Sequence, residues 1–513
     1  MNATLRGAPA ALSLQATARL TAAAAAGACM NLGFAPYGWW PIALLSPAAL
    51  FALIRGLPPR RGMTVGWSFG VGLFGFGTYW LYTCLHVFGL VPIWLTLILQ
   101  AALVIVMAGY LAALCYFANR FWLKPTVTRD WLVLPVLWVL IEWLRGWLFS
   151  GFPWLSTGYA LIDSPLAGWA PLFGVYGITW AAAAIAVAFN VSFMPGVSRS
   201  RRAVASIVAV LLMVAPLLFG LHRWTRPAGA VMSIAAVQGA VPQDQKWQLK
   251  NRQMTMDRYL RLTEQAWGSR LIIWPESSLP VIANNIQDYL QKLQEAGRAH
   301  HADLAIGLVN FTVDTGQYFN GLLVLPASTD DHGGWYYKRH LVPFGEYFPV
   351  PSTVRSWMRL MSLPNEDFTP GTARQPSLSA AGQKLGLTIC YEDAFGSQQL
   401  AALREATLLI NVTNNAWFGD SMAPHQHLQI ARMRALESER YLVQASNDGV
   451  TAAVDAQGTV IAQLPQFVEG VLHAQLEPRI GLTPYARFGN FPVILGASAF
   501  LLLAIWRRRT GDV

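Results

Sequence analysis

Long apolar runs dominate the first 228 residues and limit what this chain can fold into. An apolar helix of about 20 residues spans the hydrocarbon core of a bilayer. Eight runs approach or exceed that length: 18–34, 39–54, 64–84, 89–117, 131–149, 168–194, 203–222 and 489–506. The first run is rich in alanine, and the fourth and sixth are long enough to tilt or to break. The sequence therefore predicts a polytopic membrane domain of about eight transmembrane helices.

Charge divides the chain into three parts. Residues 1–228 have a net charge of +11, residues 229–488 a net charge of −3 and residues 489–513 a net charge of +2. We therefore predict a transmembrane domain of seven helices over 1–228, a globular domain over 229–488, and a last transmembrane helix with a basic tail over 489–513. The basic residues belong to the membrane flanks, which argues against nucleic acid as a partner because that function requires a basic folded domain.

The short loops between the apolar runs predict the orientation in the membrane. Cytoplasmic loops are enriched in Lys and Arg. One alternate set of loops is basic, with Arg6, Arg19, Arg55, Arg60, Arg61, Arg120, Lys124, Arg129, Arg199, Arg201, Arg202 and Arg507 to Arg509. The other set, near 35–38, 85–88 and 150–167, has almost none. This alternation places both termini in the cytoplasm and the globular domain outside it.

The globular domain alternates short apolar runs with helical patterns. Strands are expected over 232–239, 270–276, 302–310, 319–326, 384–390, 407–414 and 441–448, followed by a hairpin around "AQGT", and helices over 248–266, 286–300, 396–405 and 425–440. This mixture indicates an α/β or α+β layered domain. The long stretch 347–370 carries many apolar side chains and two arginines, and we interpret it as an arm that faces the membrane.

Cys390 in "GLTICYEDAF" is the one cysteine of the globular domain, since Cys29, Cys84 and Cys115 fall in predicted membrane spans. Its thiol has no disulfide partner there, although an extracytoplasmic compartment is oxidising. Two readings remain open on these residues alone. Cys390 is an inert core residue, as unpaired cysteines often are, or it is a nucleophile that something activates against the neighbouring carboxylates.

Three other fragments carry groups that could help such a thiol. "IIWPESSLP" puts Glu276 after an apolar strand, "YYKRHLVPFGEYFP" offers Lys338 and Glu346, and "NVTNNAWFGD" puts Asn414 and Trp417 after another buried strand. Each fragment also has an ordinary reading as a cap, a solvated charge or a turn. Together they supply a base, a cation and a nucleophile at the ends of separate strands, which is the set that acyl transfer needs.

These motifs resemble the nitrilase, or carbon–nitrogen hydrolase, superfamily, which uses a Glu-Lys-Cys triad on an α-β-β-α sandwich. With the membrane spans, "SGFPWLSTGY", "VPQDQKW", "ICYED" and "QHLQIARMRALESER", nearly the whole chain resembles the membrane-embedded apolipoprotein N-acyltransferase family. The resemblance implies Cys390 as nucleophile, Glu276 as general base and Lys338 as oxyanion partner beside the N–H of Tyr391. It also implies supporting roles for Glu346, Tyr391, Glu392, Trp247, Asn310 and Trp417.

The resemblance further implies a reaction. A membrane phospholipid, typically phosphatidylethanolamine, gives its sn-1 acyl chain to Cys390 as a thioester. The N-terminal amine of diacylglyceryl-cysteine on an apolipoprotein then takes the acyl chain. The expected setting is the bacterial inner membrane, with the catalytic domain on the periplasmic side. The triad alone leaves open a membrane-tethered nitrilase-type amidase, and the apolar half alone a transporter or lipid-binding scaffold.

We expect no cofactor and no metal, since His425 and His427 have poor spacing for zinc. Within the spans, Glu142 and Arg145 are three residues apart on one helical face and can pair. We interpret them as a structural pair that supports the loop "GFPWLSTGY".

Overall fold

The computed structural model describes residues 8–121, 127–328, 333–347 and 367–510, and divides them into two compact units. The helical unit comprises residues up to His222 together with Ser421–Gln429 and the segment from Phe488 onward, and the sheet unit comprises Arg223–Asp420 and Ile430–Arg487. Helix α13 (Ala423–Ser438) therefore contributes its first residues to one unit and its remainder to the other. Most of the predicted apolar arm, 348–366, lies outside the described residues.

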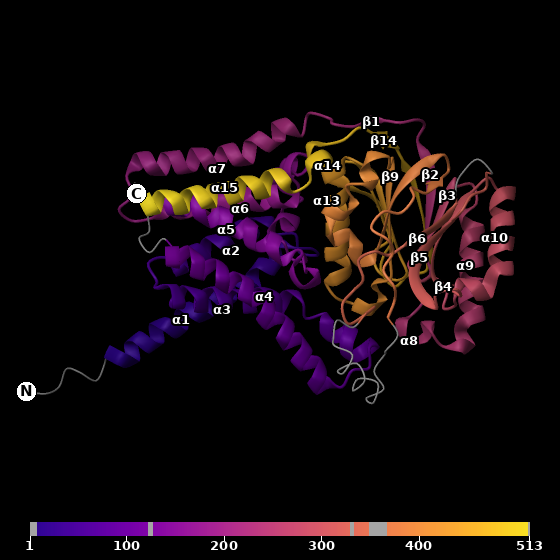
Figure 1. Cartoon of the computed structure of the whole chain (residues 1–513), viewed down its shortest axis with the longest axis horizontal. Helices are drawn as coiled ribbons and strands as arrows, with labels where there is room; N and C mark the ends of the chain where they lie inside the picture. Colours follow the sequence, from indigo (N-terminus) through magenta and orange to yellow (C-terminus); the bar gives the residue numbers. More distant parts are fainter. Residues whose placement is uncertain (1–7, 122–126, 329–332, 348–366, 511–513) are drawn as a thin grey trace, which may run out of the picture. The chain divides into compact units, whose positions relative to one another are not determined.

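All eight predicted apolar runs contain helices of the helical unit (Figure 1). They are α1 (Ala8–Met30), α2 (Trp40–Ile54), α3 (Pro59–Gly77), α4 (Ile93–Phe121), α5 (Val127–Arg145), α6 (Ala170–Phe193), α7 (Arg199–Phe219) and α15 (Phe491–Thr510). Three segments among the described residues, Ile93–Phe121, Pro165–Phe193 and Arg199–Phe219, are long and apolar enough to cross a membrane. Helix α2 and Phe491–Trp506 of α15 are apolar but shorter. The chain thus has membrane-type helices, but the count of eight spans is not confirmed.

Small residues let the first helices approach one another closely. A Cβ atom added at Gly27 of α1 would lie 2.0 Å from the carbonyl oxygen of Phe69 in α3, and one at Gly72 would lie 1.9 Å from that of Ala24 in α1. These distances are far below a normal contact, so only glycine fits at either position. Such close backbone packing is the usual way in which helices associate in membranes.

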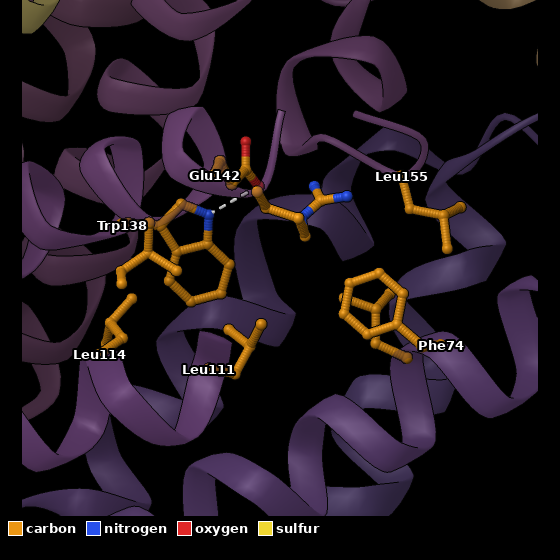
Figure 2. Close-up of a pocket in the computed structure, with 9 residues that line it drawn as sticks. Phe74, Leu111, Leu114, Trp138, Glu142 and Leu155 are labelled. Carbon is orange, nitrogen blue, oxygen red and sulfur yellow. Dashed lines mark hydrogen bonds between the residues drawn. The ribbon is translucent and has the colours of Figure 1, made fainter. Parts of the chain in front are cut away.

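Two buried charges on α5 hold the loop that follows it. The Glu142 carboxylate accepts hydrogen bonds from Trp138 Nε1 (3.0 Å), from the Thr157 N–H (3.0 Å) and hydroxyl (2.6 Å), and from the Thr179 hydroxyl (3.0 Å). Figure 2 shows Glu142 and Trp138 at the edge of a small cavity that is otherwise lined mainly by apolar side chains. The buried Arg145 guanidinium donates to the carbonyl oxygens of Phe152 and Trp154 and to the Ser156 hydroxyl. Both groups therefore fix residues 152–157, in agreement with a structural role.

The sheet unit contains two six-stranded sheets. One has the order β13-β2-β3-β4-β5-β6 and the other β12-β11-β10-β9-β8-β7. Their strands are β2 (Met232–Gln238), β3 (Leu271–Trp274), β4 (Asp303–Thr312), β5 (Gln317–Leu325), β6 (Gly334–Tyr337), β7 (Ser379–Ala380), β8 (Gln383–Ile389), β9 (Leu408–Thr413), β10 (Leu442–Ser446), β11 (Ala452–Val454), β12 (Val460–Gln463) and β13 (Gly470–Leu476). In each sheet three central strands, β2-β3-β4 and β8-β9-β10, run parallel. The strands β1 (Arg226–Pro227) and β14 (Arg479–Ile480) form a separate antiparallel pair.

The two sheets bury a shared apolar core. Side chains of β2 and β3, such as Ile234 and Ile273, join one cluster with Leu387 of β8, Ile410 of β9 and Val443 of β10. The opposite face of β2, β3 and β4 is covered by α9 (Arg252–Ala266) and α10 (Gln287–Ala299). In Figure 1 helix α13 lies on the other side of the strands from α9 and α10. The layers are therefore helix, sheet, sheet and helix, as the predicted α-β-β-α sandwich requires.

Candidate active site

Cys390 stands at a sharp bend directly after β8. Its φ of +51° lies in the left-handed region, which residues other than glycine seldom occupy. The backbone then continues into a short 3₁₀ turn, Cys390–Ala394. Asn411 of β9 donates its side-chain N–H to the Cys390 carbonyl oxygen at 3.2 Å and so holds the bend. Strained backbone of this kind concentrates at functional sites, and here it fixes the direction of the Cα–Cβ bond of a partly buried thiol.

Glu276 and Lys338 follow strands of the facing sheet and form a buried ion pair. Glu276 comes two residues after β3, and Lys338 comes directly after β6. The Lys338 ammonium lies 3.2 Å from Oε1 of Glu276 and 2.9 Å from Oε1 of Glu346. The structure therefore brings three of the predicted site residues into direct contact, with one cation between two carboxylates.

Two asparagines complete the environment of these carboxylates. Asn320 of β5 donates its side-chain N–H to Oε1 of both Glu276 (2.7 Å) and Glu346 (2.8 Å). The backbone N–H of Asn414, just after β9, donates to Oε2 of Glu276 at 2.9 Å. Sequence analysis missed Asn320 altogether and noted Asn414 only for its position. The available signal was an amide side chain in an otherwise apolar strand, "FNGLLVLP".

Glu392 connects the residues that follow Lys338 to the turn at Cys390. Its Oε2 accepts hydrogen bonds from the Ile389 N–H (2.8 Å) and the Tyr336 hydroxyl (3.0 Å). Its Oε1 accepts from the backbone N–H groups of Arg339 (2.7 Å) and His340 (3.2 Å). One buried carboxylate therefore ties the residue before Cys390 to the two residues after Lys338.

The electrostatics favour a neutral thiol beside an ionised carboxylate. Burial opposes ionisation of Glu276, but the Lys338 ammonium and the hydrogen bonds to the carboxylate outweigh it, so its pKa lies below the usual value. Burial also opposes the Lys338 charge, but Glu276 and Glu346 raise the pKa of that ammonium well above normal. Burial raises the pKa of the Cys390 thiol to about 12, and the negative charge of Glu276 adds to this effect.

The carboxylates next to Cys390 in sequence are not those that most affect its thiol. Glu276 and Glu346 raise the pKa of Cys390, whereas Lys338 and a hydrogen bond with the Thr413 side chain lower it. Burial raises the pKa of the adjacent Asp393 to about 7. These pKa shifts describe a protonated Cys390 thiol close to an ionised Glu276 carboxylate, a pair between which a proton can pass.

The remaining predicted residues surround this cluster at different depths. Asn310 donates to the Tyr337 hydroxyl at 2.6 Å, next to Lys338. The Tyr391 ring packs edge-on against Phe395 with centroids 5.0 Å apart. Trp247 and Trp417 are large and exposed, with 50% and 39% of their surface accessible. Trp417 stands three residues after Asn414, whose backbone N–H donates to Glu276.

Among the described residues no group of three or more His, Cys, Asp or Glu side chains could hold a metal ion. The cluster combines a thiol, ionised carboxylates and a buried ammonium, a set with which a cysteine can form and release a covalent acyl intermediate.

Known protein families match both units of the chain. Residues 233–485 match the carbon-nitrogen hydrolase family, so the sheet unit contains a domain of that superfamily. Residues 26–188 match the N-terminal domain of apolipoprotein N-acyltransferase. The chain is 39% identical to the apolipoprotein N-acyltransferase of Methylococcus capsulatus, across 94% of this chain and 95% of that protein. It is 38% identical to the one from Azotobacter vinelandii, across 95% of each. The chain therefore belongs to the apolipoprotein N-acyltransferase family.

A solved amidase from Nesterenkonia sp. is also similar, with 20% sequence identity and a TM-score of 0.36, and covers 52% of this chain and 97% of its own. This overall similarity is low.

Proposed function

We propose that this protein transfers the sn-1 acyl chain of a membrane phospholipid, through a thioester on Cys390, to the N-terminal amine of diacylglyceryl-cysteine on apolipoproteins. The observation that carries the proposal is the Lys338 ammonium, 3.2 Å from Glu276 and 2.9 Å from Glu346, in the domain that holds a strained cysteine. The choice of substrates is supported by relatives that are named apolipoprotein N-acyltransferase and that match this chain over almost their whole length.

In the first half-reaction the Cys390 sulfur attacks the ester carbonyl carbon of the phospholipid. Glu276 takes the thiol proton as the carbon–sulfur bond forms. The negative charge that develops on the carbonyl oxygen is stabilised by the Lys338 ammonium and by the backbone N–H of Tyr391. The tetrahedral intermediate then expels the glycerol oxygen, which receives the proton from Glu276, and lysophospholipid leaves.

In the second half-reaction the amine of the acceptor attacks the thioester carbonyl. Glu276 accepts the proton that the amine loses, and the same oxyanion partners act again. Collapse breaks the carbon–sulfur bond, and the proton returns to the sulfur of Cys390. Because one covalent intermediate serves two lipids in turn, the kinetics should be ping-pong.

The setting of this reaction is part of the proposal. We propose that 1–228 forms seven transmembrane helices, that 229–488 is the periplasmic catalytic domain, and that 489–513 forms the eighth helix with a basic cytoplasmic tail. The basic loops described above support this orientation. Glu346 and Glu392 act as positioning residues, and Asn310, Tyr391, Trp247 and Trp417 border the lipid substrate.

Mass spectrometry of the purified protein tests the proposal. After incubation with phosphatidylethanolamine alone, the Cys390 peptide should gain an acyl mass that hydroxylamine removes. A diacylated lipopeptide should then discharge it and become triacylated. Cys390→Ala should abolish the acyl mass, and Cys29→Ala is the matched control. Consumption of phospholipid without acylation of Cys390 would refute the nucleophile assignment, and discharge by water alone would show an amidase.

A further inference from the structure

The one-turn helix α8 (Gln243–Lys246) carries a buried cation that the reaction described above does not use. Lys246 is 0% exposed, and within the part of the chain that the structure describes its Nζ has no hydrogen-bond partner. Among the described residues the same holds for Oδ1 of Asp448 and Oδ1 of Asn414, both also buried. Buried charged groups are normally paired, so these atoms require an explanation.

Hydrogen bonds connect α8 to the proposed general base. The Gln243 side-chain oxygen accepts from the Asn414 side-chain amide at 3.0 Å. The backbone N–H of that asparagine donates to Oε2 of Glu276 at 2.9 Å. Lys246 is three residues after Gln243, one helical turn further along the chain. The helix that holds Lys246 is therefore two hydrogen bonds away from the Glu276 carboxylate.

A second set of hydrogen bonds brings Asp448 to the same helix. The Asn447 carbonyl accepts from the Ala240 N–H (2.7 Å), and its side chain bonds both the N–H (3.2 Å) and the carbonyl (2.8 Å) of Val241. The residue that follows Asn447 is Asp448, and the residues that follow Val241 lead directly into α8. An acidic side chain is thus fixed beside the segment that carries the buried lysine.

The charges around Lys246 act on one another. Burial lowers the pKa of Lys246 to about 8, while the negative charges of Glu276 and Asp448 oppose this shift. Burial raises the pKa of Asp448 to about 6, and Lys246 opposes that shift in turn. Two further groups, Tyr259 and Arg258 of α9, face this region: the Tyr259 hydroxyl donates to Asn447 at 3.3 Å, and Arg258 donates to the Gly239 carbonyl.

We propose that Lys246 is a positioning residue, on the helix that connects to Oε2 of Glu276, and that it keeps this carboxylate ionised while Lys338 stabilises the oxyanion. This inference rests on the proposed function, in which Glu276 must accept a proton in both half-reactions. The ammonium of Lys338 is shared between two carboxylates and then drawn toward the developing negative charge on the substrate. A second buried cation in the same field offsets the loss of that support.

The pH dependence of Cys390 acylation tests this role. Removing a cation near Glu276 raises the pKa of that carboxyl, so the base is protonated at a higher pH. In Lys246→Met the acid midpoint of the acylation rate should therefore rise by about one pH unit. Asp448→Asn should leave the midpoint unchanged, because burial raises the pKa of Asp448 to about 6 and this carboxyl is therefore already neutral where Glu276 titrates. Lys250→Met, with the same change of charge at an exposed position four residues on, should leave it unchanged.

Acylation of the full chain in phospholipid nanodiscs, followed by peptide mass spectrometry between about pH 2 and pH 8, gives these midpoints. The inference is overturned if Lys246→Met slows acylation equally at every pH, which is the result of a purely structural role. It is also overturned if Lys250→Met produces the same shift. Should Lys246→Met fail to fold, as judged by thermal unfolding, Lys246→Gln removes the same charge with a polar side chain, and its midpoint should rise in the same direction.

A chemical readout separates this inference from the proposed function. Iodoacetamide alkylates Cys390 without any lipid, and its rate also depends on an ionised Glu276. If wild-type protein is alkylated at Cys390 but never acylated by phospholipid, the proposed function fails. The alkylation midpoints of Lys246→Met and Lys250→Met then still decide whether Lys246 sustains the charge of Glu276.

Discussion

The two units of this protein each bury a carboxylate and a cation, but they satisfy them differently. In the sheet unit the partners are charged, because Lys338 lies between Glu276 and Glu346. In the helical unit the Glu142 carboxylate accepts bonds from neutral donors, and Arg145 donates to carbonyl and hydroxyl oxygens of the loop 152–157.

The difference shows what each buried charge can do. An ammonium has three N–H donors, and Glu276 and Glu346 occupy two of those of Lys338, which leaves capacity for a substrate oxygen. The donors to Glu142 are instead buried groups of the same unit, from Trp138, Thr157 and Thr179. Burial alone therefore does not identify a catalytic group. The two clusters differ in the nature of the partners. Substitution of Lys338 should therefore lower activity, and substitution of Glu142 should lower stability.

The largest effect is expected for Cys390, the proposed nucleophile. Cys390→Ala removes the sulfur that carries the acyl chain, so the rate of lipopeptide acylation should fall by a factor on the order of 10⁴ or more. The melting temperature should hardly change, since the thiol is only partly buried. A product assay with mass spectrometric detection measures the rate. Substantial residual transfer would mean that another group carries the acyl chain.

Lys338→Met should come next. The substitution keeps the length of the side chain but removes the cation between two carboxylates, so oxyanion stabilisation is lost and the acylation rate should drop by a factor of roughly 10²–10³. Lys384→Met, at an exposed position on β8, is the matched control and should retain the wild-type rate. Equal losses in both variants would contradict the special position of Lys338.

Glu392→Gln should have an intermediate effect. An amide presents one oxygen and one NH₂ group where the carboxylate accepts from N–H groups on both oxygens. The residues that follow Lys338 and the turn at Cys390 should then shift apart. A misplacement of about 1 Å costs roughly 10²-fold in rate. Single-turnover acylation should be slowed while phospholipid binding, measured separately, stays intact. Weakened binding with an unchanged chemical step would argue against a positioning role.

Glu142→Ala should reverse the pattern. It leaves buried donors of Trp138, Thr157 and Thr179 without their acceptor, and each such group costs about 1–3 kcal/mol. The protein should unfold at a lower temperature in detergent, yet each folded molecule should acylate at the wild-type rate. Thr21→Val, at an exposed hydroxyl of α1, is the control. A specific loss of catalysis at full stability would give Glu142 a role in the reaction.

The smallest effect is expected in the pH dependence of Cys390 alkylation. Burial raises the pKa of Cys390 to about 12, so wild-type alkylation should show no inflection near about pH 8.5, where an ordinary thiol titrates. The lowered pKa of Glu276 means that the base stays ionised down to pH values below the usual carboxyl range. Stopped alkylation followed by mass spectrometry gives the profile. An inflection near the ordinary thiol value would contradict the protonated resting state.

The sequence predicted the strands that carry the candidate site because these strands are short, apolar and followed by polar residues. The strands near Glu276, Cys390 and Asn414 begin and end within a few residues of the predicted bounds. Strands β6 and β13 were missed: "GWYY" is only four residues long and begins with glycine, and "GVLHAQL" mixes polar with apolar residues without a clean alternation.

The sequence did not predict contacts between side chains that are far apart along the chain. Asn320 was missed because nothing local indicates that a side chain on β5 meets carboxylates 44 and 26 residues away. The motif "VPQDQKW" contains Lys246, but the sequence does not indicate that this lysine is buried, since its burial depends on distant strands. Apolar composition likewise identified eight helical segments, but three of them are long and apolar enough by themselves to cross a membrane.

The bonds made by Glu392 have a consequence for substrate choice. Because this one side chain holds the backbone on both sides of the site, hydrogen bonds within the chain itself fix the segments that carry Lys338 and Cys390. Little reorganisation energy then remains for the reaction itself. Discrimination among head groups and acyl chains should accordingly be made by the surfaces that admit the lipid, and variants with altered lipid preference should keep the same intrinsic rate of thioester formation.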